Sequence, residues 1–261
     1  MIKKIKLSFL AIITAFFFST PVVAEESSYS ISGNIGMMSD YVFRGIPQSS
    51  SSAYGGVDFE SGGFYLGTWF ADLGPSGKWE SGSHQGIEYD VYAGYGMDIT
   101  DTLSGYIGYT IYRYSDKGSD AFDDDYDEYN IGVSYAVSDD FSVSLDYANG
   151  ENTAVGGTET DYDVGTITFD YLGLTLTVGD WGISEDDTGE TDASWWELGY
   201  GATVGDFDIS GALIFSEKEL ATATDSGEDG DFTNVVFSIG YSQQNSLNLN
   251  YITLAFIATL L

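Results

Sequence analysis

The sequence predicts an all-β fold, a transmembrane antiparallel up-and-down β-barrel of about twelve strands. First, apolar residues alternate with polar or small ones in run after run, which is typical of strands with two unlike faces. Second, each run has about nine residues or more, enough for a tilted strand to cross the hydrocarbon layer of a bilayer. Third, the connections between runs alternate between short and long, as they do in outer-membrane barrels.

Residues 1–24 have the features of a secretory signal peptide. Three lysines precede an apolar run over residues 7–18, and a small-residue cleavage site ends at Ala24. An uncleaved membrane anchor is the alternative, but the apolar run is too short to span a bilayer. We therefore expect the chain to be exported and cleaved.

Composition limits the partners of the exported chain. There is no cysteine, so neither a disulfide framework nor a thiolate metal site can form. The 41 acidic and 8 basic residues give a net charge of −33, which repels nucleic acid and anionic lipid. Aromatic residues make up 16% of the chain and apolar residues 43%, which argues against disorder.

The period-two alternation places the strands along the chain. In the clearest run, over residues 87–97, Ile87 and Tyr89 alternate with Glu88 and Asp90. Strands are expected at residues 29–43, 52–60, 64–72, 85–97, 103–114, 128–137, 141–149, 161–171, 174–182, 194–204, 207–216 and 232–241.

The connections favour a barrel over a soluble sandwich. Short connections follow the even-numbered strands, whereas long ones follow the odd-numbered strands, beginning with residues 45–51. An outer-membrane barrel has tight turns at its periplasmic end and long loops at its external end, so its connections alternate in length. Nothing in the architecture of a soluble sandwich requires such an alternation. Closure also leaves no strand edge unsatisfied in lipid.

The end of the chain departs from this pattern. Phe237, Ile239 and Tyr241 resemble the aromatic final strand that barrel-assembly machinery recognises, yet the chain continues. The barrel domain is therefore predicted over residues 25–241. Residues 242–261 are expected to form a poorly anchored extension with little order, and an added strand, a short amphipathic segment and a reading-frame artefact are the alternatives.

A local motif points the same way. Residues 39–48 read SDYVFRGIPQ, a strand that breaks into a turn at Gly45 and Pro47. This run resembles the SDYVFRGISQ motif of the TorF-type porin family, with Pro47 in place of the usual serine. The similarity continues at residues 55–59, 63–69 and 88–95. The resemblance implies an outer-membrane β-barrel without catalytic residues, and it supplies no substrate.

Strand parity assigns charged residues to the lumen, because a charge facing lipid at mid-membrane would cost about 2–4 kcal/mol for a base and less for an acid. The residues predicted to line the pore are Asp40, Arg44, Asp58, Glu60, Glu88, Asp90, Asp146, Asp170, Glu197 and Asp208. Arg44 is expected to pair with Asp40 or with an acid of a neighbouring strand, as part of a constriction. A structural ion pair or a position at the rim is the alternative. The excess of acids favours cations if the path is open.

The remaining candidates give weaker signals. Acid-rich loops at residues 120–128, 185–190 and 225–231 match no EF-hand spacing, so a solvated acidic rim is expected, and no metal site. The aromatic girdles at the two membrane interfaces are expected to include Trp79, Trp181, Trp195 and Trp196. His84, the only histidine, lies in a loop, and an enzyme would rest on it alone.

These observations predict a porin of the cell outer membrane that passes small hydrophilic solutes by diffusion, with a preference for cations. The alternatives are a non-conducting, acidic-looped adhesin or envelope-structural barrel and, less favoured, an enzyme acting on lipid. No cofactor is implied. Expected partners are outer-membrane lipid and lipopolysaccharide, barrel-assembly machinery, and small solutes or ions, but not nucleic acid.

Overall fold

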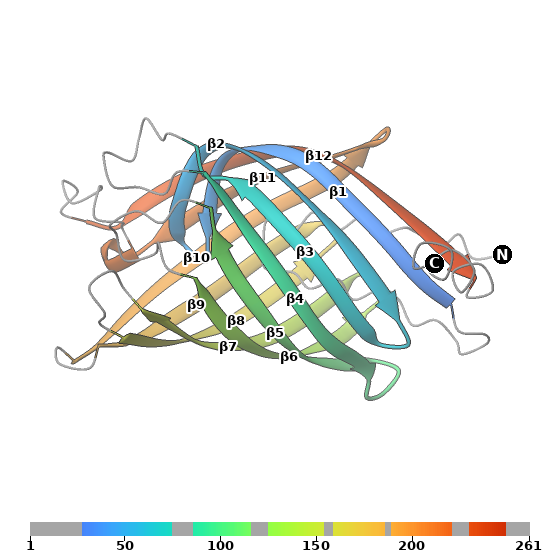
Figure 1. Ribbon diagram of the computed structural model, residues 1–261, viewed down its shortest axis with the longest axis horizontal. Helices are drawn as coiled ribbons and strands as arrows, with labels where there is room; N and C mark the ends of the chain where they lie inside the picture. The colour runs from blue at the N-terminus through green and yellow to red at the C-terminus, as the bar shows by residue number, and fades with distance from the viewer. Residues whose placement is uncertain are drawn as a thin grey trace, which may run out of the picture.

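The computed structural model describes residues 28–74, 86–115, 125–153, 159–185, 189–220 and 230–248, which leaves the predicted signal peptide outside the described part. These residues form a closed barrel of twelve antiparallel strands, as Figure 1 shows, and this confirms the predicted fold class. The strands are β1 (Ser28–Phe43), β2 (Ile46–Ser61), β3 (Phe64–Asp72), β4 (Ile87–Asp98), β5 (Leu103–Tyr114), β6 (Tyr126–Ser138), β7 (Phe141–Thr153), β8 (Glu159–Tyr171), β9 (Leu174–Glu185), β10 (Gly189–Val204), β11 (Phe207–Ser216) and β12 (Phe232–Asn248), with a 3-10 helix η1 (Lys218–Leu220) after β11. Among the described residues, no helix is long and apolar enough to cross a membrane.

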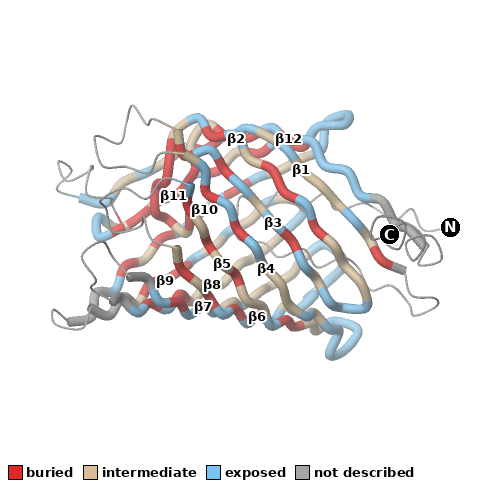
Figure 2. Tube along the Cα trace, viewed as in Figure 1, coloured by how far each residue is buried: buried red, intermediate tan, exposed pale blue. Residues whose placement is uncertain are grey.

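The outer face of the barrel is apolar and exposed. On β4, Ile87, Tyr89 and Val91 are exposed, whereas Glu88 and Asp90, between them, are buried. The same alternation recurs around the ring, where exposed and covered residues follow each other along each strand (Figure 2). Exposed apolar residues include Ile35, Val57, Leu66, Ile107, Ile131, Val133, Leu145, Val178, Leu198, Ile209, Leu213, Val235 and Ile239. Such a surface is stable when it faces lipid.

Adjacent residues of β9 test this assignment of the two faces. Val178 is exposed on the outer face, whereas the neighbouring Thr177 exchanges a hydrogen bond of 3.1 Å with Thr168 inside. We expect Val178→Arg to destabilise the barrel in lipid by about 2–4 kcal/mol, because its charge would enter the hydrocarbon layer. Thr177→Arg, the matched control, should cost much less. Urea unfolding in bilayers measures both, and equal losses would contradict the assignment.

The short connections lie at one end of the barrel. Gly62 and Gly63 both have positive φ (58° and 89°), the conformation that a two-residue type I′ turn requires. Ser28 at the start of β1 pairs with Asn248 at the end of β12, so the first and last strands meet at this end. The expected tight turns after the even-numbered strands are therefore present where the strands are described.

The last strand is longer than the sequence indicated. Residues 242–248 continue the ladder of β12 with β1, so the predicted boundary at Tyr241 falls inside a strand. The alternation stops at Tyr241 because the following residues are mostly polar, while the backbone pairing goes on. Residues 249–261 lie outside the described part.

The first connection differs most from expectation. The long loop predicted over residues 45–51 is wrong, because β2 begins at Ile46 and the turn consists of Arg44 and Gly45 alone. Both have positive φ (48° and 82°), as a type I′ turn requires. Pro47 is accommodated because the register shifts between Tyr41 and Val42, and such a bulge tolerates a missing backbone donor.

This hairpin also leaves the barrel wall. The ladder between β1 and β12 ends at the pair Met38–Ser238, and the ladder between β2 and β3 ends at Tyr54–Ala71. Beyond these points β1 and β2 pair only with each other among the described strands, and they fold into the lumen. We call residues 39–53 the inner hairpin.

Candidate functional site

The tip of the inner hairpin crosses the lumen. The Arg44 guanidinium donates two hydrogen bonds, of 2.6 and 2.8 Å, to the Glu128 carboxylate on β6. The Trp181 indole on β9 donates to the Arg44 carbonyl at 2.9 Å, and the Ser216 hydroxyl on β11 donates to the Gly45 carbonyl at 2.8 Å. Since β6 and β9 lie on the far side of the ring from β1 and β2, the turn spans the barrel.

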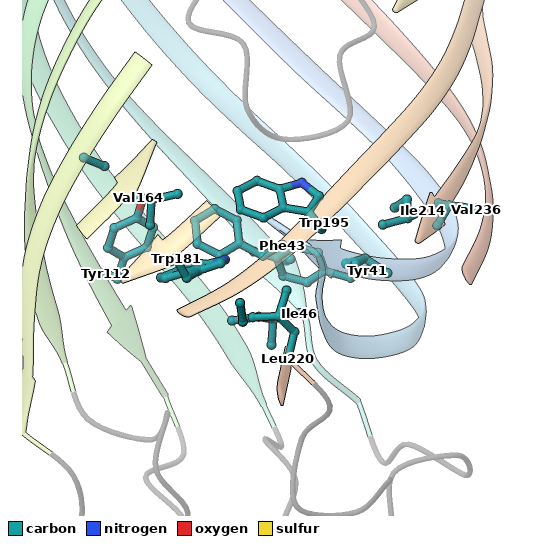
Figure 3. Close-up of a cluster of buried hydrophobic side chains, with 14 of the residues drawn as sticks. Tyr41, Phe43, Ile46, Tyr112, Val164, Trp181, Trp195, Ile214, Leu220 and Val236 are labelled. Atoms are coloured by element: carbon teal, nitrogen blue, oxygen red, sulfur yellow. The ribbon is translucent and has the colours of Figure 1, made fainter. Parts of the chain in front are cut away.

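Apolar contacts fill the space around this turn. Phe43 and Ile46 pack with Trp195 and Leu220 in the cluster that Figure 3 shows. A Cβ atom at Gly45 would collide with Trp195 and Leu220, so only glycine fits this position, which also has positive φ. The hairpin is therefore seated by close packing as well as by polar bonds.

An arc of aromatic side chains forms the seat for the hairpin on the opposite wall. Tyr112 stacks on Tyr126 with ring centroids 4.4 Å apart, and contacts continue through Tyr162 and Trp181 to Trp195. These rings come from β5, β6, β8, β9 and β10, so the arc follows nearly half of the circumference.

The arc corrects the expectation of aromatic girdles for two residues. Trp181 and Trp195 are buried inside the barrel rather than placed at a membrane interface. Trp196 does face outward, where it stacks on Phe215 at 3.8 Å, and Trp79 lies outside the described residues. Trp195 and Trp196 lie on opposite sides of the wall because consecutive residues of a strand point to opposite faces.

The ion pair is enclosed. Glu128 is fully buried and also accepts hydrogen bonds from the Asn130 amide and, at 3.1 Å, from the Tyr162 hydroxyl. The two opposite charges compensate each other, which offsets the cost of burying both. The guanidinium also lies 4.8 Å from the centroid of the Phe43 ring. The pair is thus shielded from water by its surroundings.

More carboxylates lie beside the hairpin than one arginine can neutralise. Glu88 is 2% exposed and accepts a hydrogen bond of 2.8 Å from Tyr41, while Asp90, two residues along the same face of β4, is 7% exposed. Glu128 is already paired with Arg44, so Glu88 and Asp90 are two further buried acids beside the hairpin.

The other half of the lumen, toward the chain ends, is polar and partly exposed. Asp58 accepts a hydrogen bond from Tyr92, and Asp146 accepts one of 2.9 Å from Tyr106. Other predicted residues there are Glu60, bonded by Ser30, Asp208, bonded by Thr203 and Ser242, and the partly exposed Asp170 and Glu197. Hydroxyl pairs, such as Ser134 with Ser144, fill the spaces between them.

The structure places most of the predicted residues on the inner side of the barrel wall. Asp58, Glu88, Asp90 and Asp208 are buried, and the exposed neighbours of each point outward. Asp40 lies on the inner hairpin next to the turn. The structure brings Arg44, Glu88 and Asp90 into one region but leaves the other acids spread around the wall, and their role in lining a pore stays a prediction.

Glu128 is the important residue that the sequence reasoning missed. The sequence places Glu128 at the boundary between an acid-rich loop (residues 120–128) and an expected strand (residues 128–137), whereas β6 begins at Tyr126 and buries Glu128 inside the barrel. Its parity relative to the exposed Tyr129 and Ile131 was the available signal. The partner of Arg44 is thus on β6, across the lumen, and not on an adjacent strand.

The closed ring, its apolar outer face and its polar inner face define a porin-like β-barrel of the outer membrane. The chain belongs to the family described as "Bacterial protein of unknown function (Gcw_chp)", whose model matches residues 23–242.

The solved structures to which this chain is similar include two porins and an outer membrane channel. The NanC porin is 10% identical, with a TM-score of 0.51 over 82% of this chain and 99% of its own. The KdgM porin is 14% identical (TM-score 0.46; 81% and 98% covered), and an outer membrane channel from Pseudomonas putida F1 is 11% identical (TM-score 0.44; 89% and 100% covered). At such identity the NanC likeness shows the fold alone. No curated protein is significantly similar in sequence to this chain.

Proposed function

We propose that this barrel is a narrow outer-membrane channel that passes small hydrophilic solutes by diffusion and prefers cations. The observation that carries the proposal is the contrast between the two faces of one sheet. The outer face presents exposed apolar residues, whereas the inner face presents carboxylates, hydroxyls and tyrosines that water partly reaches. A polar, hydrated interior is the property that distinguishes channel barrels from filled ones.

Charge on the inner face supports the preference for cations. Seven of the predicted lumen acids, together with Glu128, lie on strands β2, β4, β6, β7, β8 and β10, and Asp40 and Asp208 on β1 and β11 add to them. Arg44 is the only arginine or lysine among the described residues whose side chain reaches this interior, and it is neutralised by Glu128. Rings of carboxylates favour cations over anions in pores.

Reversal potentials in a salt gradient test the selectivity. We expect the purified barrel in a planar bilayer to favour K⁺ over Cl⁻, because acids dominate its lumen. Replacing three partly exposed lumen acids, in Asp146→Asn, Asp170→Asn and Glu197→Gln, should move the reversal potential toward zero. Asp139→Asn, in the exposed turn between β6 and β7, is the matched control and should change nothing. An anion preference in the native protein would contradict the proposal.

A second candidate function is favoured by the inner hairpin. Its tip crosses the lumen and buries Phe43 and Ile46 among aromatic rings, as a permanently closed structural or adhesive barrel would require. The two candidates differ in conductance. A folded protein that gives no current in a planar bilayer would favour the non-conducting barrel.

The finer assignments remain predictions. The resemblance to the TorF-type porin family rests on residues 39–48 and three further segments, and it suggests a passive channel rather than an enzyme. His84, on which an enzyme would depend, lies outside the described residues. Outer-membrane lipid, lipopolysaccharide and barrel-assembly machinery are the expected partners.

A further inference from the structure

The barrel wall has a seam where the inner hairpin has folded inward. Residues 232–237 of β12 pair with β11 on one side, but their ladder with β1 stops at Ser238. On the other side of the seam, the ladder between β2 and β3 stops at the pair Tyr54–Ala71, one residue before β3 ends. A pocket of about 380 Å³ lies at the seam, between Ser39 and Ser51 of the hairpin and Phe237 of β12.

Two serines of the hairpin bond to the ends of the interrupted ladders. The Ser39 hydroxyl accepts a hydrogen bond of 3.0 Å from the backbone N–H of Phe237, and the Ser49 hydroxyl donates one of 3.2 Å to the carbonyl of Asp72. Each serine thus replaces one backbone bond that a continuous ladder would make. The hairpin leaves the wall at these defined points.

The hairpin sequence also suits a position in the wall. Continuing the register of Met38 with Ser238 would pair Ser39 with Phe237, Tyr41 with Val235 and Phe43 with Thr233. In that position Tyr41 and Phe43 would share the outward face of Met37, and Asp40 and Arg44 would face the lumen. The alternation in residues 29–43 is that of a wall strand along its whole length.

Around its tip, the inward position is held by the packing of Phe43 and Ile46 and by a small number of polar contacts. The polar ones described above join Tyr41, Arg44 and Gly45 to Glu88, Glu128, Trp181 and Ser216. Each contact can be lost without breaking a ladder of the wall, because the hairpin strands pair only with each other.

We propose that the inner hairpin has a second position in the barrel wall, paired with residues 233–237 of β12, and that this position is the open state of the channel. The proposal rests on the channel function proposed above. Moving the hairpin into the wall satisfies the free edge of β12 and clears the lumen, so one motion both closes the seam and opens the path.

Engineered cysteines test the second position directly, because the chain has none of its own. Tyr41→Cys with Val235→Cys should form a disulfide under oxidant only if the hairpin visits the wall. Ile35→Cys with Tyr241→Cys is the matched control, because these residues are paired in the wall already and belong to the same outward-facing row. We expect both pairs to cross-link. Failure of the first pair while the second forms would overturn the proposal.

Conductance then tests whether the wall position is the open one. Cross-linking the Tyr41→Cys, Val235→Cys pair should raise single-channel conductance severalfold, reductant should reverse the rise, and the control pair should show no change. Tyr41→Cys alone controls for the lost hydrogen bond to Glu88. A cross-link that leaves the conductance unchanged would overturn the open-state assignment. Absence of current in every form would contradict the channel function instead, while the cross-linking yield would still decide whether the second position exists.

The rate of cross-linking also reports how often the hairpin occupies the wall position rather than the inward one. Glu128→Gln, added to the Tyr41→Cys, Val235→Cys pair, should speed cross-linking about tenfold, because the inward position would then bury Arg44 without its counter-charge. Asp170→Asn, which removes a partly exposed lumen acid at the end of β8 far from Tyr162, should leave the rate unchanged. Equal rates in the two variants would count against a hairpin held inward by this ion pair.

Discussion

Excision of the hairpin tip is expected to raise single-channel conductance severalfold. Replacing residues 41–49 with two glycines would join Asp40 to Ser50, which are paired, through a tight turn. This change removes the contacts that the tip makes across the lumen to Glu128, Trp181 and Ser216. Current through purified barrels in planar bilayers measures the effect.

Phe43→Leu is the control for this excision, because it keeps the hairpin and a similar apolar volume beside Tyr112. We expect its conductance to stay near that of the native protein. If the excised barrel folds, as judged by its β-sheet circular dichroism, and yet conducts no better than the native one, the inner hairpin is not the constriction.

Arg44→Ala is expected to produce the largest loss of stability of any single substitution in the lumen. It would leave the fully buried Glu128 without its counter-charge, and breaking a buried pair in this way costs about 3–5 kcal/mol. Adding Glu128→Gln should recover much of the loss, since the uncompensated charge is then gone. Urea unfolding of the native protein, the two single variants and the double variant gives the coupling energy.

A second arginine of the chain is the matched control. Arg113 bonds to Asp127 at 3.2 Å, but the two side chains are 30% and 43% exposed. Such a solvated pair contributes about 0–1 kcal/mol, so Arg113→Ala should change the free energy of unfolding little. Equal losses for Arg44→Ala and Arg113→Ala would show that the Arg44 pair is not enclosed as described.

The sequence predicted the wall of the barrel well because membrane-facing strands obey one simple rule. On β4, the order of Ile87, Glu88, Tyr89 and Asp90 assigns two residues to lipid and two to the interior, and the structure agrees. The same parity would have separated Trp195 from Trp196. Tryptophan and tyrosine occur both in interfacial girdles and inside the lumen, so the residue type alone could not distinguish the two locations.

The inner hairpin could not be predicted by that rule. Gly45 and Pro47 are typical of a loop, and only the tertiary contacts of Phe43 and Ile46 show that the chain stays paired through them. Alternation over residues 29–43 fits a strand in the wall as well as one folded inward. Whether this segment lies in the wall or folds inward depends on Glu128, the partner of Arg44, which lies far away in the sequence on β6.

Accessibility of single cysteines to a small, charged, membrane-impermeant thiol reagent tests most directly whether this sheet separates lipid from a wet interior. In proteoliposomes, Thr177→Cys on the inner face of β9 should react readily, whereas Val178→Cys, one residue along on the outer face, should be protected by lipid. Rapid reaction at position 178 together with protection at position 177 would contradict the account.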